Sequence, residues 1–162
     1  MRFGIPTSAV AAALLAAALP SAAQAAQRLV DARQVSSDTL RDVAVATFER
    51  GRPIIYYNPQ LMARLGPELS AFFLAHEYGH LYYGHTGAAL ADAGSDLGTV
   101  RQRQELAADC YATASLAERE PEAVRAALEF FNRMGPFRFD NLHPSGAQRA
   151  AKILACLPAS GS

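Results

Sequence analysis

The stretch His76-Glu77-Tyr78-Gly79-His80, inside the apolar segment of residues 69–81, decides the fold of this chain. On a helix, residues four apart leave from one face one turn apart, so His76 and His80 direct two imidazoles at one metal ion. Glu77 is offset by one residue, which places its carboxylate beside such an ion, where it can accept a proton. Two histidines on a buried helix need polar partners, and a metal ion satisfies both. The pattern predicts a buried metal-binding helix; two core histidines with protein partners are the alternative.

A third ligand is needed, because a catalytic zinc ion takes three protein ligands and keeps a fourth position for water. Glu105 is the first candidate, since it lies on a second expected helix where the small residues Ala107 and Ala108 permit close helix packing. A solvated carboxylate on a helix face is its alternative. His85 is the rival ligand, but it follows His80 by five residues, whereas the metzincin pattern requires six. We expect His85 at the helix end, facing the last carbonyl groups.

The segments around the motif predict a small β-structure and a set of helices. Two β-prone runs, residues 42–49 and 53–57, flank Arg50-Gly51-Arg52 and predict a hairpin, with a helix over residues 37–49 as the alternative for the first run. Residues 86–98 and 136–143 are expected to be loops. Helices are expected from Gly66-Pro67-Glu68 to about Gly84, over residues 99–118, from Glu120-Pro121-Glu122 to Met134-Gly135-Pro136, and over residues 144–157. The fold class predicted is α+β, mainly helical, with a small hairpin or sheet packed on the metal-binding helix.

Residues 1–25 have the pattern of a targeting segment. Arg2 is followed by an apolar run over residues 9–19, then Pro20, and Ala23-Gln24-Ala25 fits a signal-peptidase site. The run is shorter than the roughly 20 residues that span a bilayer, so cleavage is favoured over an uncleaved anchor. The prediction is a signal peptide at residues 1–25 and a single domain at residues 26–162. It implies a periplasmic or secreted protein with no stable membrane span after cleavage.

Charge and cysteine content restrict the partners and the compartment. The 15 basic and 15 acidic residues balance, which argues against a nucleic-acid partner. Cys110 and Cys156 both follow the cleavage site, and an oxidising compartment permits a disulfide between them. The alternative is two free buried thiols. We favour the disulfide, because closing a long loop stabilises a small exported domain.

The chain resembles the M48 family of gluzincin metallopeptidases in its H-E-x-x-H helix and in the downstream E-x-x-A-D of Glu105 to Asp109. The strand expected over residues 53–57 and the segment His143-Pro144 with Arg149 add to the resemblance, which covers about residues 54–154. It implies a zincin-like core in which His76, His80 and Glu105 bind Zn²⁺. The gap from His80 to Glu105, 25 residues, is shorter than is usual in that family.

The resemblance also implies roles for residues around the metal. Asp109 would orient a ligand histidine from behind it. His143 would face the active site and stabilise an oxyanion, with a loop histidine that caps the last helix as the alternative. Arg149 would hold a nearby carboxylate or face solvent.

These features predict a zinc-dependent endopeptidase that cleaves exported or envelope proteins with a metal-activated water. Glu77 would take the proton from that water and return it to the leaving amine. A peptide or unfolded protein would lie as an added strand along residues 54–57. The substrate cleft would be shallow or completed by a partner, and the expected partners include a regulatory protein. One alternative is a non-catalytic metal- or protein-binding module on a peptidase-like scaffold. Another is a structural zinc protein with a fourth ligand from His85 or Asp109.

Overall fold

The computed structural model describes residues 31–85 and 96–159, and it is an α+β structure with a small sheet and five helices in this part of the chain. The signal peptide predicted at residues 1–25 and most of the loop predicted at residues 86–98 lie outside the described residues. The elements are β1 (Arg33–Ser36), β2 (Ala44–Glu49), β3 (Arg52–Tyr57), α2 (Pro59–Leu65), α3 (Pro67–Tyr82), α4 (Leu97–Leu116), α5 (Pro121–Met134) and α6 (Gly146–Ala155). None of the described helices is long and apolar enough for a membrane span.

The sheet has the order β1-β3-β2, and the predicted hairpin is confirmed. Arg50 and Gly51 both have positive φ, 51° and 77°, which is the two-residue turn that matches the twist of a hairpin. The alternative helix over residues 37–49 is wrong, because β2 pairs with β3 in this region. Strand β1, which pairs parallel to β3, was not predicted. The central position of β3 means that both of its edges are already paired.

Strand β2 has one edge, its free edge, that pairs with no other strand among residues 31–85 and 96–159. Phe48 is opposite Pro53, which has no N–H, so this pair exchanges no ladder hydrogen bonds. Opposite pairs alternate along an antiparallel ladder, so the N–H and C=O groups of Ala46 and Ala44 also point away from β3. The free backbone groups on this side of the sheet therefore belong to β2. The expected substrate edge at residues 54–57 is corrected accordingly.

Two helices follow β3 directly. Asn58 caps α2, since its side-chain oxygen accepts from the N–H groups of Gln60 (2.9 Å) and Leu61 (3.1 Å), and Pro59 occupies the first turn. Helix α2 was not among the helices predicted from the sequence. Helix α3 begins at Pro67 as predicted and carries the H-E-x-x-H motif.

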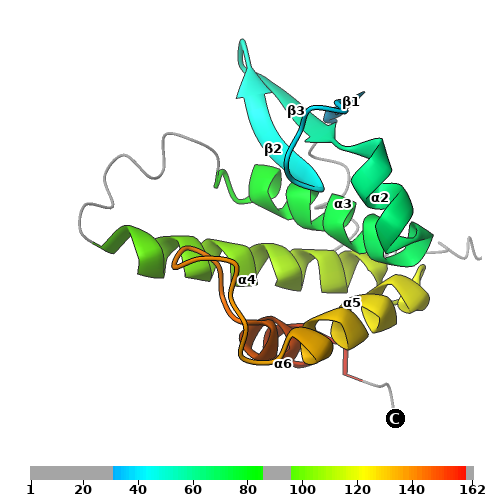
Figure 1. Cartoon of the computed structure of the whole chain (residues 1–162), viewed down its shortest axis with the longest axis vertical. Coiled ribbons are helices and arrows are strands. Elements are labelled where there is room, and N and C mark those ends of the chain that lie inside the picture. Colours follow the sequence, from blue (N-terminus) through cyan, green and yellow to red (C-terminus); the bar gives the residue numbers. More distant parts are fainter. Residues whose placement is uncertain (1–30, 86–95, 160–162) are drawn as a thin grey trace, which may run out of the picture.

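The remaining helices lie close to their predicted bounds. Helix α6 differs, because it begins at Gly146 rather than at Pro144. Ser145 caps it in a capping box with Gln148, which places Pro144 before the cap. Figure 1 shows the sheet at one side of α3, with α4 beneath α3 and with α5 and α6 farthest from the sheet.

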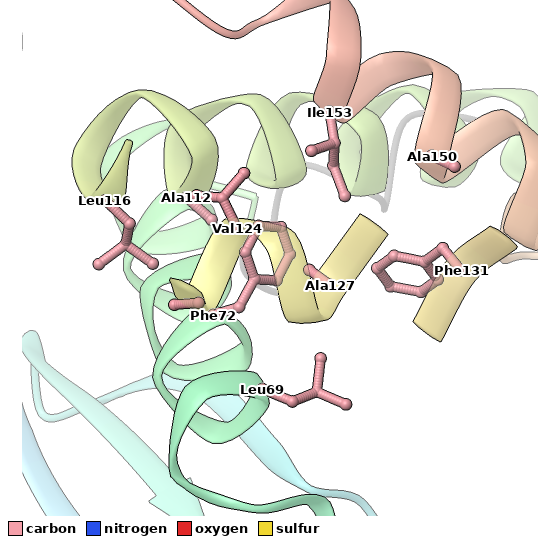
Figure 2. Close-up of a cluster of buried hydrophobic side chains, with 10 residues drawn as sticks. Leu69, Phe72, Ala112, Leu116, Val124, Ala127, Phe131, Ala150 and Ile153 are labelled. Atoms are coloured by element: carbon pink, nitrogen blue, oxygen red, sulfur yellow. The ribbon is translucent and has the colours of Figure 1, made fainter. Parts of the chain in front are cut away.

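The main core lies between the helices, where α3, α4, α5 and α6 meet (Figure 2). Phe72 of α3 and Phe131 of α5 are fully buried, with ring centroids 6.5 Å apart in an edge-to-face arrangement. A smaller cluster around Ile55 and Leu81 joins the sheet to α3. Helix α3 is therefore fixed on both sides, by the sheet and by the other helices.

Candidate metal centre

The structure brings the side chains of His76, His80 and Glu105 to one buried point. His76 Nε2 lies 3.0 Å from His80 Nε2 and 3.2 Å from Glu105 Oε2, and His80 Nε2 lies 3.4 Å from Glu105 Oε1. Helix α3 supplies the histidines one turn apart, and α4 supplies the glutamate. All three residues are buried. This group can hold a metal ion, and Glu77 is outside it.

The donor set fits a divalent ion. Zinc bonds of 2.0–2.1 Å in a tetrahedron separate the ligand atoms by roughly 3.3 Å, which is close to the spacings between these atoms. Two imidazole nitrogens and a carboxylate also form a ligand set that suits zinc. The carboxylate of Glu105 has a pKa below its usual range: burial acts to raise it, but hydrogen bonds from His76 and His80 outweigh burial.

A close contact between α3 and α4 permits this convergence. Gly79 faces α4 one residue before His80, and a Cβ at this position would lie 2.9 Å from Ala108 Cα and 3.0 Å from Tyr111 Cβ. Real Cβ atoms essentially never approach other atoms that closely. The glycine in the motif therefore lets Glu105 reach both histidines.

Two buried charged residues, Asp109 and Arg149, lie on the side of His76 away from the metal position. His76 Nδ1 lies 2.9 Å from Asp109 Oδ1, and a carboxylate can only accept, so Nδ1 carries the proton and Nε2 is left to face the metal position. Arg149 of α6 donates to both oxygens of Asp109, from Nε (2.8 Å) and Nη2 (2.5 Å). The guanidinium also lies 4.1 Å from the centre of the Phe131 ring. Asp109 thus lies where the resemblance implied, and Arg149 is buried rather than solvated.

The pKa values of His76, Asp109 and His80 are shifted by burial and by their hydrogen-bond partners. The pKa of His76 is raised to about 9, since hydrogen bonds to Asp109 and Glu105 exceed the opposing effect of burial. The pKa of Asp109 is lowered, because the charge of Arg149 outweighs the effect of burial. Burial is the main cause of the lowered pKa of His80.

Glu77 lies at the wall of the same cleft and contacts the sheet. Its Oε2 accepts a 2.6 Å hydrogen bond from the N–H of Ala46, on the free edge of β2. Burial raises the pKa of Glu77 to about 7, and the charge of His76 and the hydrogen bond from Ala46 offset only part of this effect. A carboxyl group that titrates near neutral pH can both accept and release a proton. The contact with Ala46 was not predicted; the missing N–H of Pro53 is the sequence signal that indicates the free edge.

The cleft over these residues has a volume of about 600 Å³. His76, Glu77, His80 and Glu105 line it, together with residues 41–43, the beginning of β2 (residues 44–46) and apolar side chains from α2, α3 and α5. His143 lines the cleft as well, and its Nδ1 lies 2.8 Å from Asp140 Oδ1. His85 also lines the cleft, but it does not belong to the metal-binding group; its ring stacks on Tyr83, and burial lowers its pKa to about 4.

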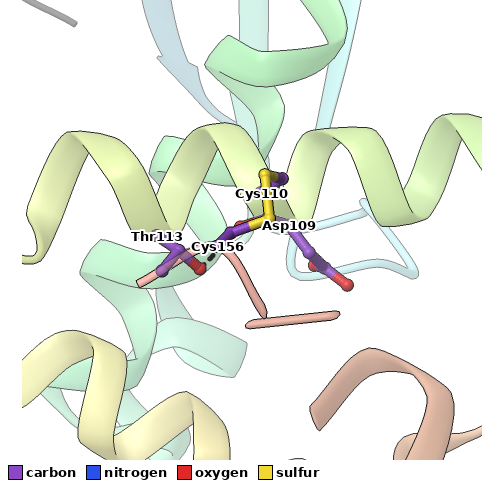
Figure 3. The surroundings of a disulfide bond; sticks show 4 residues. All are labelled: Asp109, Cys110, Thr113 and Cys156. Atoms are coloured by element: carbon purple, nitrogen blue, oxygen red, sulfur yellow. Dashed lines mark hydrogen bonds between the residues drawn. A yellow bond between two sulfur atoms is a disulfide. The ribbon is translucent and has the colours of Figure 1, made fainter. Parts of the chain in front are cut away.

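A disulfide joins Cys110 of α4 to Cys156 at the end of α6, as Figure 3 shows. Cys110 directly follows Asp109, and α6 carries Arg149. The covalent link and the Arg149–Asp109 ion pair therefore connect the same two helices.

Comparison of this chain with family models, with curated proteins and with solved structures gives no match.

Proposed function

We propose that this protein is an exported zinc-dependent endopeptidase with a zincin-like core. One observation carries the proposal: two histidines and a glutamate converge at zinc-ligand spacing in an open cleft whose wall also holds the carboxyl group of Glu77. A closed structural site is not favoured, because neither Asp109 nor His85 belongs to the metal-binding group. A zinc ion bound there would lower the pKa of water and polarise a peptide carbonyl.

The side chains around the metal position transfer protons, orient the ligands and bind the substrate. Glu77 accepts a proton from the attacking water and later delivers it to the leaving amine. Asp109 fixes the tautomer of His76, and Arg149 holds Asp109 in place. His143, oriented by Asp140, supplies a hydrogen-bond donor at the cleft for the oxyanion. The free edge of β2 offers its outward backbone groups to an extended peptide, except the N–H of Ala46, which donates to Glu77.

The Glu77→Gln variant tests this assignment. Glutamine keeps the size of the side chain and removes the proton acceptor, so we expect zinc stoichiometry to remain near one and casein hydrolysis to fall by at least about 100-fold. Metal content is measured by atomic emission and hydrolysis by release of labelled peptides.

Glu68→Gln is the matched control, because Glu68 is an exposed residue in the first turn of the same helix. It should retain full activity. Unchanged hydrolysis by Glu77→Gln would eliminate the mechanism. Zinc binding without hydrolysis in the unmodified protein would instead support the non-catalytic module.

A further inference from the structure

The loop of residues 136–145, between α5 and α6, carries two exposed phenylalanines, and hydrogen bonds hold its backbone. Phe137 and Phe139 are 57% and 64% exposed, and their ring centroids lie 5.6 Å apart in an edge-to-face arrangement. Backbone hydrogen bonds close the base of the loop: Gly146 N–H donates to the carbonyl of Phe137 (3.1 Å), and Ala147 N–H donates to the carbonyl of Gly135 (2.7 Å).

Polar contacts also fix the far end of this loop. Asp140 Oδ1 accepts from the N–H groups of Leu142 (2.7 Å) and His143 (2.9 Å), and Gln102 of α4 donates to the carbonyl of Asn141 (2.9 Å). Loops with joined ends and internal polar contacts are frequently functional. These hydrogen bonds fix the loop backbone, although its two largest apolar side chains are exposed to solvent. This combination indicates a contact surface.

This surface is continuous with the cleft. Phe139 and Leu142 line the cleft that holds His76 and Glu77, and the Phe139 ring contacts that of Phe137 outside it. The cleft wall also includes Ala44 and Ala46 of β2, on the free edge of the strand. The N–H of Ala46 donates to Glu77, which leaves the outward groups of Ala44 and the carbonyl of Ala46 to match those of an extended polypeptide. Phe139 and the β2 edge therefore line the same cleft, so one polypeptide in this cleft can contact both.

The charges of the loop favour a polypeptide over a lipid surface. Arg138 and Asp140 give the loop one charge of each sign, and Arg138 bonds to Gln148 while Asp140 bonds to His143. Loops that bind anionic membranes carry an excess of lysine and arginine. Apolar side chains of an unfolded polypeptide need no such excess.

We propose that Phe137 and Phe139 form a docking surface, outside the metal centre, for apolar side chains of an unfolded polypeptide. The inference rests on the proposed peptidase function and names its substrate class: unfolded proteins, whose apolar residues are exposed. Short peptides that fill only the cleft would bypass Phe137.

The test is a binding measurement with the zinc-loaded, full-length Glu77→Gln protein and fluorescein-labelled β-casein. Adding Phe137→Ser should weaken binding by at least about tenfold, because aromatic anchors carry much of the free energy of such contacts. Leu154→Ser is the matched control: Leu154 is 55% exposed on α6 and does not line the cleft, and its variant should bind within about twofold of the parent. Equal binding by Phe137→Ser and its parent would overturn the docking surface.

Two further outcomes complete the test. If phosphatidylglycerol vesicles bind the parent and not Phe137→Ser, while casein binding is equal, the surface is a lipid contact and the proposal is wrong. With Glu77 intact, Phe137→Ser should raise KM for casein about tenfold and change kcat/KM for a tetrapeptide by less than about twofold. A protein that hydrolyses neither substrate refutes the peptidase function, whereas the binding measurement still decides the docking surface.

Discussion

At the scale of single residues, Gly79 and Arg149 show how the centre depends on positions that bind no metal. Gly79 occupies a variable position of the H-E-x-x-H motif, yet the contact between α3 and α4 requires a residue without a Cβ. Arg149 belongs to the buried stripe of α6, together with Gly146, Ala150 and Ile153. An arginine at helical spacing within an apolar stripe is a sequence signal of a buried ion pair, and it points to Asp109 only once the fold is known.

Replacing Gly79 with alanine should therefore separate α3 from α4. We expect a loss of about 1–3 kcal/mol in the free energy of unfolding, as is usual for overpacked contacts. Zinc affinity should fall by at least tenfold, because Glu105 would no longer reach both histidines. Urea unfolding and competition with a chelator measure the two effects.

Gly98→Ala on α4 is the matched control for this prediction. A Cβ there would meet only the carbonyl of Asn141 at 3.4 Å. Alanine has a higher helix propensity than glycine, so the free energy of unfolding of this variant should be equal to or slightly higher than that of the parent. Its zinc affinity should be unchanged. If both variants behaved alike, the close approach at Gly79 would not matter to the centre.

At the scale of elements, α6 contributes to the centre although it supplies no metal ligand. The disulfide joins residues 46 positions apart, and its closed loop contains all of α5 and all of α6. Both Arg149 and Phe131 lie within this loop, so the link limits how far the Arg149–Asp109 pair can separate in the unfolded chain.

Removing the disulfide should lower stability strongly. For a loop of this length the chain-entropy relation gives about 4 kcal/mol, and we expect a loss of 2–4 kcal/mol for the double variant Cys110→Ala, Cys156→Ala in urea unfolding. A non-chelating reductant should weaken the unmodified protein similarly and leave the double variant unaffected. If the double variant were as stable as its parent, the packing of α6 against α5 would hold α6 in place without the disulfide.

At the scale of the whole molecule, metal binding and folding should be coupled. The three ligands come from α3 and α4, and they meet only in the folded chain, so zinc binds the folded state preferentially. At a free zinc concentration 100-fold above Kd the gain is about 2.7 kcal/mol, and the melting temperature should rise by more than about 5 °C. Calorimetry with and without a chelator measures the shift.

Two controls belong to the metal experiment. Magnesium at the same concentration should give no shift, because a site with two imidazoles suits zinc rather than magnesium. The His80→Ala variant should show no response to zinc. A zinc response retained by that variant would place the ion somewhere other than this centre.

Export of the protein is a separate prediction for the whole molecule. Cleavage after Ala25 should give a mature chain that begins at Ala26, detected by intact mass and N-terminal sequencing of the exported protein. Changing Ala23 and Ala25 to bulky residues should block processing, because the peptidase site accepts small side chains at these positions. A mature protein that retains Arg2 would contradict the predicted signal peptide.

The sequence by itself determined the local features of this protein. Helical spacing placed His76 and His80 on one face, Arg50-Gly51 marked the hairpin turn, and Pro67 and Pro121 marked the beginnings of two helices. These features depend on residues a few positions apart, whose geometry the backbone fixes.

Only the tertiary structure decided the contacts between distant residues. Glu105 completes the cluster because Gly79 admits α4, Ala46 reaches Glu77 because β2 rather than β3 has a free edge, and Arg149 meets Asp109 because α6 packs against α4. Sequence spacing does not encode such distances. They follow from how buried faces of separate elements pack together, which is a property of the whole folded chain.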